Sequence, residues 1–72
     1  MQYAYNKLRG KIIDKCGTLS GFSAKIGLSE RSISLKMNGK RQWTQGDITK
    51  ACDILEIDHA DIPAYFFAPK VQ

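Results

Sequence analysis

The 72-residue sequence has no long hydrophobic run and contains few cysteine, histidine and proline residues. No apolar stretch reaches the roughly 18 residues that a membrane span needs. The N-terminus lacks the apolar segment of a secretory signal, so we expect a protein of the cytoplasm with no membrane contact. A chain of this length forms one small domain, which cannot both build the walls of a typical enzyme cleft and keep a core.

Two cysteines and a single histidine leave few groups for metal or redox chemistry. Cys16 and Cys52 each fall on an expected apolar helix face, so we interpret both as small buried hydrophobic residues. A disulfide would be unusual in a reducing compartment. His59 has no cysteine pair near it and is interpreted as a surface residue, so no zinc site is expected. With no paired nucleophile and base and no glycine-rich phosphate loop, we expect neither an enzyme nor a cofactor.

Charge is distributed unevenly along the chain. Residues 1–42 carry nine Lys and Arg against two acidic residues, a net charge of +7, whereas residues 43–72 carry two Lys against five acidic residues, a net charge of −3. A basic half is the electrostatic footprint expected of a phosphate-binding surface, although solvated helix faces give the same pattern. The acidic half would repel DNA, so it should face away from DNA or meet a partner protein.

The spacing of apolar residues predicts an all-α, compact four- to five-helix fold. Helices are expected over residues 5–16, 19–26, 30–37 and 44–55, with a short turn near 59–62. The single domain, residues 1–72, is expected to comprise a loose arm at 1–4, a helical core at 5–57, and a C-terminal turn with an aromatic tail at 58–72.

Polar residues and a proline mark the boundaries of the last two helices. Thr44 begins the helix over 44–55, and Asp47 three residues later is a near-miss of the capping box, which normally uses Glu or Gln. Asp58 could cap the last short turn. Pro63 limits any helix there, because proline is excluded from helix interiors.

Residues 22–39 read as two short helices joined by a tight turn at Gly27, which can take the positive φ that such a turn needs. Ser23 is small where the two helices would cross closely, and Thr18 and Ser29 are the expected N-caps. This is the helix-turn-helix pattern, whose second helix lies in the DNA major groove. The side chains expected to point outward from that second helix are Glu30, Arg31, Ser32, Ser34 and Lys36.

The stretch from Tyr5 to about Ile57 resembles the phage repressor and Cro family of helix-turn-helix proteins. The residues that carry the resemblance are YNKLRGKI, IGLSERSISLKMNGK and WTQGDITKACDILEI. The size and the terminal YFF look like the small early regulators of temperate-phage genetic switches, which include Cro-like repressors and the antirepressors called modulators of repression. The resemblance implies a lambda-repressor-like fold and a role in the lysogeny/lysis switch within the bacterial host cell. Double-stranded DNA, a partner phage repressor, or both are the implied partners.

The same resemblance implies DNA-binding roles for individual residues. Thr18 would lie against the DNA backbone, and Arg31 is the expected contact to guanine. Lys36 stands where the family often has a buried apolar residue, so its stem would be partly covered while it is counted with the DNA-binding set. The positions that would read base edges are Glu30, Arg31, Ser32, Ser34 and Leu35. Those that would grip phosphates are Asn38, Lys40 and Arg41.

Three departures from the family pattern weaken the case for autonomous DNA binding. Leu19 stands where many relatives have Gln, and Ser20 and Gly21 stand where polar helix formers are usual. Glu30 brings a negative charge toward the groove. Leu19 beside Phe22 suits a protein partner better than a phosphate, although core packing explains Leu19 equally well. The alternative function is therefore an antirepressor that acts mainly by binding the repressor.

Aromatic residues near the C-terminal half supply the other candidate partner contacts. Trp43 could anchor a partner, since Trp is enriched at interface hot spots, or it could cover the core between two helices. Tyr65, Phe66 and Phe67 are consecutive and hard to bury together in so small a domain. We expect one to close the core against the first helix, and at least one to be exposed and available to a homodimer. The sequence leaves open which of Phe66 and Phe67 is buried.

Overall fold

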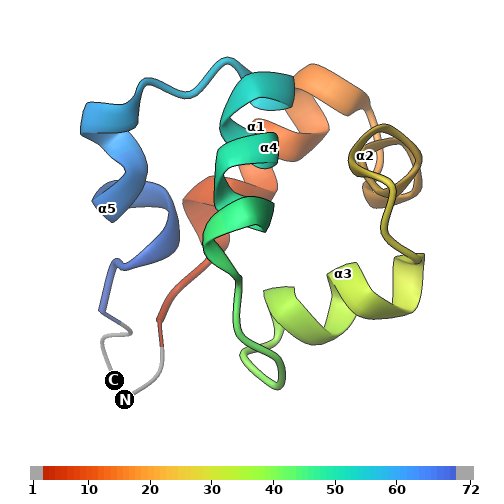
Figure 1. The fold of residues 1–72 in the computed structure, drawn as a ribbon, viewed down its shortest axis with the longest axis horizontal. Helices are drawn as coiled ribbons and strands as arrows, with labels where there is room; N and C mark the ends of the chain where they lie inside the picture. Colours follow the sequence, from red (N-terminus) through yellow and green to blue (C-terminus); the bar gives the residue numbers. More distant parts are fainter. Residues whose placement is uncertain (1–2, 70–72) are drawn as a thin grey trace.

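The computed structural model describes residues 3–69, which fold into five α-helices and one 3-10 turn (Figure 1). Within this range the only extended pairing is an isolated antiparallel bridge between Tyr3 and Pro69. The prediction of an all-α fold is confirmed. The elements in chain order are α1 (Asn6–Cys16), α2 (Leu19–Ile26), α3 (Glu30–Met37), α4 (Gln45–Leu55), the 3-10 turn η1 (His59–Asp61) and α5 (Ile62–Phe66).

One cluster of buried apolar side chains joins all five helices. Each helix supplies residues from one face, because apolar positions recur at helical spacing. Since every helix has only a few turns, this packing stabilises them more than intrinsic propensity does. The cluster consists of Leu8, Ile12, Phe22, Ile26, Ile33, Met37, Ile48, Ala51, Cys52, Leu55, Ile57 and Phe66.

The two ends of the described chain are paired with each other. The backbone N–H of Ala4 donates to the carbonyl of Ala68 at 2.8 Å. The Tyr3 ring meets the Phe67 ring edge-on, with centroids 5.5 Å apart. The expected loose arm is therefore wrong for residues 3 and 4, while residues 1–2 and 70–72 lie outside the described range.

The start of α2 packs closely against the end of α1, and Gly21 lies at this contact. The Thr18 side chain accepts a hydrogen bond from the Gly21 N–H at 2.9 Å and caps α2, as expected. A Cβ atom at Gly21 would lie 2.7 Å from the carbonyl oxygen of Cys16, which is too close for any side chain. The start of α2 can therefore approach the end of α1 only because residue 21 is glycine.

The turn between α2 and α3 forms as the sequence predicts. Gly27 has φ +79°, in the left-handed region, and its N–H donates to the Ser23 carbonyl at 3.0 Å. Ser23 is buried, and its hydroxyl donates to the Ser20 carbonyl at 2.9 Å. The Ser29 side chain accepts from the Ser32 N–H at 3.1 Å and caps α3.

Lys36 points into the protein, so its predicted outward position is wrong. Only 5% of the residue is exposed. Its ammonium donates to Asp47 Oδ2 at 2.7 Å and to the Gln42 carbonyl at 2.9 Å. Because these bonds compensate the buried charge, Lys36 links the end of α3 to the start of α4 and is not free to bind DNA.

Asp47 completes a capping box that the sequence marked only as a near-miss. Its carboxylate accepts from the Thr44 N–H at 3.2 Å, and the Thr44 hydroxyl oxygen accepts from the Asp47 N–H at 3.1 Å. Asp therefore serves here where Glu or Gln is usual. Burial is the largest single influence on the pKa of Asp47 and raises it, but the hydrogen bonds from Lys36 and Thr44 together outweigh burial and lower that pKa below its ordinary value.

The C-terminal segment contains the predicted short turn, as η1, and then forms the helix α5 where only a tail was expected. Pro63 lies in the first turn of α5, where a missing N–H costs nothing, so it begins this helix rather than preventing it. Asp58 precedes η1, but its side chain makes no capping hydrogen bond. Phe66 is buried and Phe67 is 45% exposed, which settles the question that the sequence left open. None of the helices formed by residues 3–69 is long and apolar enough to cross a membrane.

Candidate functional site

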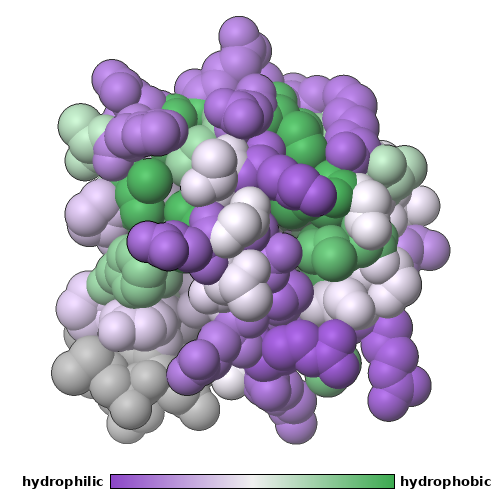
Figure 2. Space-filling view, in the orientation of Figure 1, coloured by the Kyte–Doolittle hydropathy of each residue, from purple (hydrophilic) through white to green (hydrophobic). Residues whose placement is uncertain are grey.

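The exposed side of α3 and the loop after it form a polar edge of the molecule. In Figure 1, α3 lies along one edge, away from α5. Figure 2 shows hydrophilic side chains gathered along the same lower edge. We call this surface the α3 face. It comprises the exposed Glu30, Arg31, Ser34, Asn38, Lys40 and Arg41, with Ser32 and Leu35 half-buried among them.

The loop after α3 is held tightly against the helix end. The N–H groups of Lys40 and Arg41 both donate to the Leu35 carbonyl, at 2.9 and 3.2 Å. Gly39 takes φ +74° and donates to the Lys36 carbonyl at 3.2 Å. These bonds satisfy carbonyls that a helix end leaves free. They also bring Lys40 and Arg41 to the edge of α3.

Arg41 reaches back over the first turn of α3. Its Nη1 donates to the Ser32 hydroxyl at 3.0 Å, and that hydroxyl oxygen accepts from the Ser29 hydroxyl at 3.1 Å. A guanidinium has five N–H donors, so most of them stay available to a carboxylate or phosphate. The α3 face therefore presents an oriented cation at Ser32, and Glu30 is the one acidic residue of this face.

The structure separates the predicted partner residues into buried and accessible ones. Phe22 is 0% exposed, so its predicted role as a partner contact is wrong, whereas Phe66 is 1% exposed and closes the core. Leu19 is half-buried and packs against the core. Tyr65 is also half-buried, with the Lys7 ammonium 4.8 Å from its ring centroid. Phe67 is the predicted partner residue that is plainly exposed.

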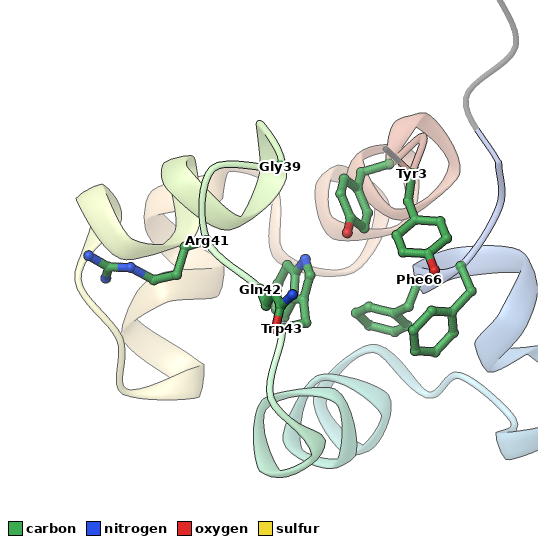
Figure 3. A pocket seen from close by; sticks show the side chains of 8 residues that line it. Tyr3, Gly39, Arg41, Gln42, Trp43 and Phe66 are labelled. Atoms are coloured by element: carbon green, nitrogen blue, oxygen red, sulfur yellow. The ribbon is translucent and has the colours of Figure 1, made fainter. Parts of the chain in front are cut away.

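Trp43 covers the core and also lines a groove. Its ring packs edge-on against Phe66, with centroids 5.3 Å apart, which supports the core interpretation of this residue. The groove, about 320 Å³ in volume, lies between the N-terminal segment, the loop after α3 and the end of α5 (Figure 3). We call it the aromatic groove. Its lining residues are Tyr3, Tyr5, Gly39, Arg41, Gln42, Trp43, Phe66 and Phe67.

Sequence reasoning missed this groove, because its walls come from both ends of the chain. The sequence marked Trp43, Phe66 and Phe67 as separate candidate contacts, but it did not indicate that Tyr3 and Tyr5 join them. No group of three or more His, Cys, Asp and Glu side chains in the part of the chain that the structure describes could hold a metal ion. The candidate contact surfaces within residues 3–69 are therefore the α3 face and the aromatic groove.

Comparison with known proteins identifies the family. Residues 1–69 match the family described as "Protein of unknown function (DUF739)". The chain belongs to this family. No curated protein sequence matches it.

A solved structure supplies a relative with a described role. It is the solution structure of the modulator of repression (MOR) of the temperate bacteriophage TP901-1 from Lactococcus lactis, which is 50% identical to this chain. The two structures superpose with a TM-score of 0.83, and the comparison covers 100% of this chain and 97% of that one. The DUF739 chain is thus a homologue of a phage modulator of repression. Of the two regulator types named by the sequence resemblance, the modulator of repression is the one that this relative supports.

Proposed function

We propose that the protein is a modulator of repression that binds the partner repressor of a temperate phage and so shifts the phage's lysogeny/lysis switch. The observation that carries this proposal is the 50% identity to a phage modulator of repression over the whole chain. With half of all positions identical over the full length, a common mode of action is the simplest inference.

The α3 face is the proposed contact surface for the repressor. In this proposal α2 and α3 form a helix-turn-helix unit, and α3 meets the partner protein where relatives of the Cro type read DNA. Arg31 and Arg41 are exposed and can each bind a carboxylate through two parallel hydrogen bonds. Lys36 takes no part, because its ammonium is held by Asp47 and Gln42.

Titration calorimetry with the repressor of the same phage tests this proposal. We expect a complex at micromolar concentrations. Arg31→Glu should weaken it about tenfold or more, because truncating or reversing a paired interface charge costs over 1.4 kcal/mol. Lys50→Glu is the matched control: Lys50 is exposed on α4 in the acidic half, so reversing it should leave the affinity nearly unchanged. Absence of any complex at micromolar concentrations would refute the proposal.

Direct DNA binding is the second candidate function, favoured by the exposed cations Arg31, Lys40 and Arg41 on the α3 face. In that case Arg31→Ala should cost about 1–3 kcal/mol at one base pair. Lys40→Ala should weaken binding to all sequences and flatten its dependence on salt concentration. A gel shift at low salt measures both, and no retardation of any DNA would dismiss this candidate.

A further inference from the structure

The walls of the aromatic groove are made of aromatic rings that contact one another in pairs. Tyr5 and Trp43 lie with centroids 6.4 Å apart, Trp43 and Phe66 5.3 Å apart, and Tyr3 and Phe67 5.5 Å apart. These separations lie within the range of about 4.5–7 Å in which aromatic pairs attract. A volume of about 320 Å³ is at the small end of ligand pockets and fits one large side chain with part of its backbone.

The wall of the groove contains a hydrogen-bond donor without a partner. The indole nitrogen of Trp43 is buried and makes no hydrogen bond to any part of residues 3–69. The Lys36 ammonium is 5.8 Å from the ring centroid of Trp43 and donates to the carbonyl of the preceding residue, Gln42. The nitrogen has almost no accessible surface, so a ligand acceptor reaches it only when the side chains that cover it shift. That acceptor then pairs with a donor whose unpaired burial costs free energy.

The charge around the groove selects an acidic occupant. The lining residues come from the segments 3–5, 39–43 and 66–67. The charged residues of these segments are both basic: Arg41, which lines the groove, and its neighbour Lys40. In Figure 3 the Arg41 side chain points away from the aromatic side chains and toward α3, where it donates to Ser32. A chain leaving the groove along this loop would therefore pass Arg41 and arrive at the α3 face. A second copy of this protein fits less well, since it would bring two such cationic loops together.

We propose that the aromatic groove binds an acidic segment of the partner repressor. One aromatic side chain of that segment enters the groove, and the Trp43 indole N–H donates a hydrogen bond to a backbone carbonyl of the segment. This inference rests on the function proposed above and names a second contact beside the α3 face. The inserted ring stacks on Tyr3 and on the exposed Phe67, and the flanking carboxylates meet Lys40 and Arg41.

Trp43 is the single tryptophan of the chain, so one indole N–H signal in the NMR spectrum of the 15N-labelled protein reports on the groove. Three pentapeptides serve as probes: Glu-Asp-Phe-Asp-Glu, the same peptide with Ala for Phe, and Lys-Arg-Phe-Arg-Lys. We expect only the first to move the indole signal in a saturable way. Phe67→Ala should weaken its binding about threefold to tenfold, the loss of one aromatic pair. Ile13→Ala, at the other exposed large hydrophobic residue within residues 3–69, is the matched control and should bind as the unaltered protein does.

The repressor itself is then added in place of the peptides, and it should move the indole signal and displace the acidic peptide. If a complex forms but the indole signal stays in place and Phe67→Ala binds the repressor normally, the groove proposal is overturned while the proposed function stands. If no complex forms at all, the proposed function fails, whatever the peptides do. An indole signal that moves with protein concentration alone would assign the groove to a second copy and also overturn the proposal.

Discussion

Two glycines inside helices differ in whether the structure has room for a side chain at their position. A Cβ atom at Gly10 of α1 would meet nothing within 4 Å, whereas one at Gly21 of α2 would lie 2.7 Å from the Cys16 carbonyl oxygen. Gly10→Ala should therefore raise the free energy of unfolding by about 0.5–1 kcal/mol through helix propensity. Gly21→Ala should lower it by about 1–3 kcal/mol, because the helices must move apart. Urea denaturation measures both changes.

The sign of each change is the test of this interpretation. If Gly21→Ala stabilises the protein as much as Gly10→Ala does, the close approach of α2 to α1 is wrong. If Gly10→Ala destabilises it, Gly10 is needed for a contact that the structure does not show.

Asp47 gives the protein a specific sensitivity to acid. Its pKa in the folded protein is lowered, so the stability it contributes is present above its ordinary pKa near 3.8 and is lost as the pH falls through the lower folded value. At neutral pH, Asp47→Asn should cost about 3 kcal/mol, because it leaves the buried Lys36 ammonium without its counter-charge. The variant should also lose less further stability than the unaltered protein between about pH 4 and pH 2.

Thermal unfolding measured from pH 7 to pH 2 checks both parts of that prediction. Asp53→Asn is the matched control, because Asp53 is exposed on the same helix. A loss of stability from Asp53→Asn as large as that from Asp47→Asn would contradict the assigned role of the Lys36–Asp47 pair.

At the scale of elements, α5 is attached through one of two adjacent phenylalanines. Phe66 is 1% exposed in the core, and Phe67 is 45% exposed. Phe66→Ala should cost about 3–5 kcal/mol through the cavity it leaves, while Phe67→Ala should cost about 1 kcal/mol or less. Chemical denaturation of the two variants compares them directly, and equal losses would contradict the placement of α5.

The helices themselves follow from the sequence, and their contacts do so only in part. Apolar spacing and the caps Thr18 and Ser29 predict α1 to α3 closely, because both signals are local. Pro63 led to the wrong prediction that it limits any helix near it, because proline is unfavourable inside a helix but favourable in its first turn. Lys36 was predicted to point outward for another reason. Its partner Asp47 is eleven positions away in the sequence, and only the folded chain brings the two side chains together.

At the scale of the whole molecule, the surface has two candidate contact regions, the charged α3 face and the aromatic groove. The α3 face belongs to the basic half, residues 1–42. Most of the residues that the sequence placed on this face are exposed in the structure. The aromatic groove could not be predicted, because Tyr3 and Phe67 come from opposite ends of the chain and meet only when those ends pair. Local patterns thus predict which residues are accessible on one helix, but not which distant segments share a groove.

Action of this protein on the repressor can be measured by a gel shift with the DNA of the phage switch region, run with the partner repressor alone and with this protein added. We expect the DUF739 protein to change the repressor–DNA complex, either releasing the DNA or altering the mobility of the band. Arg31→Glu should weaken this effect, and Lys50→Glu should not. A repressor–DNA band that is unchanged at every concentration of this protein would show that it is not a modulator of that repressor.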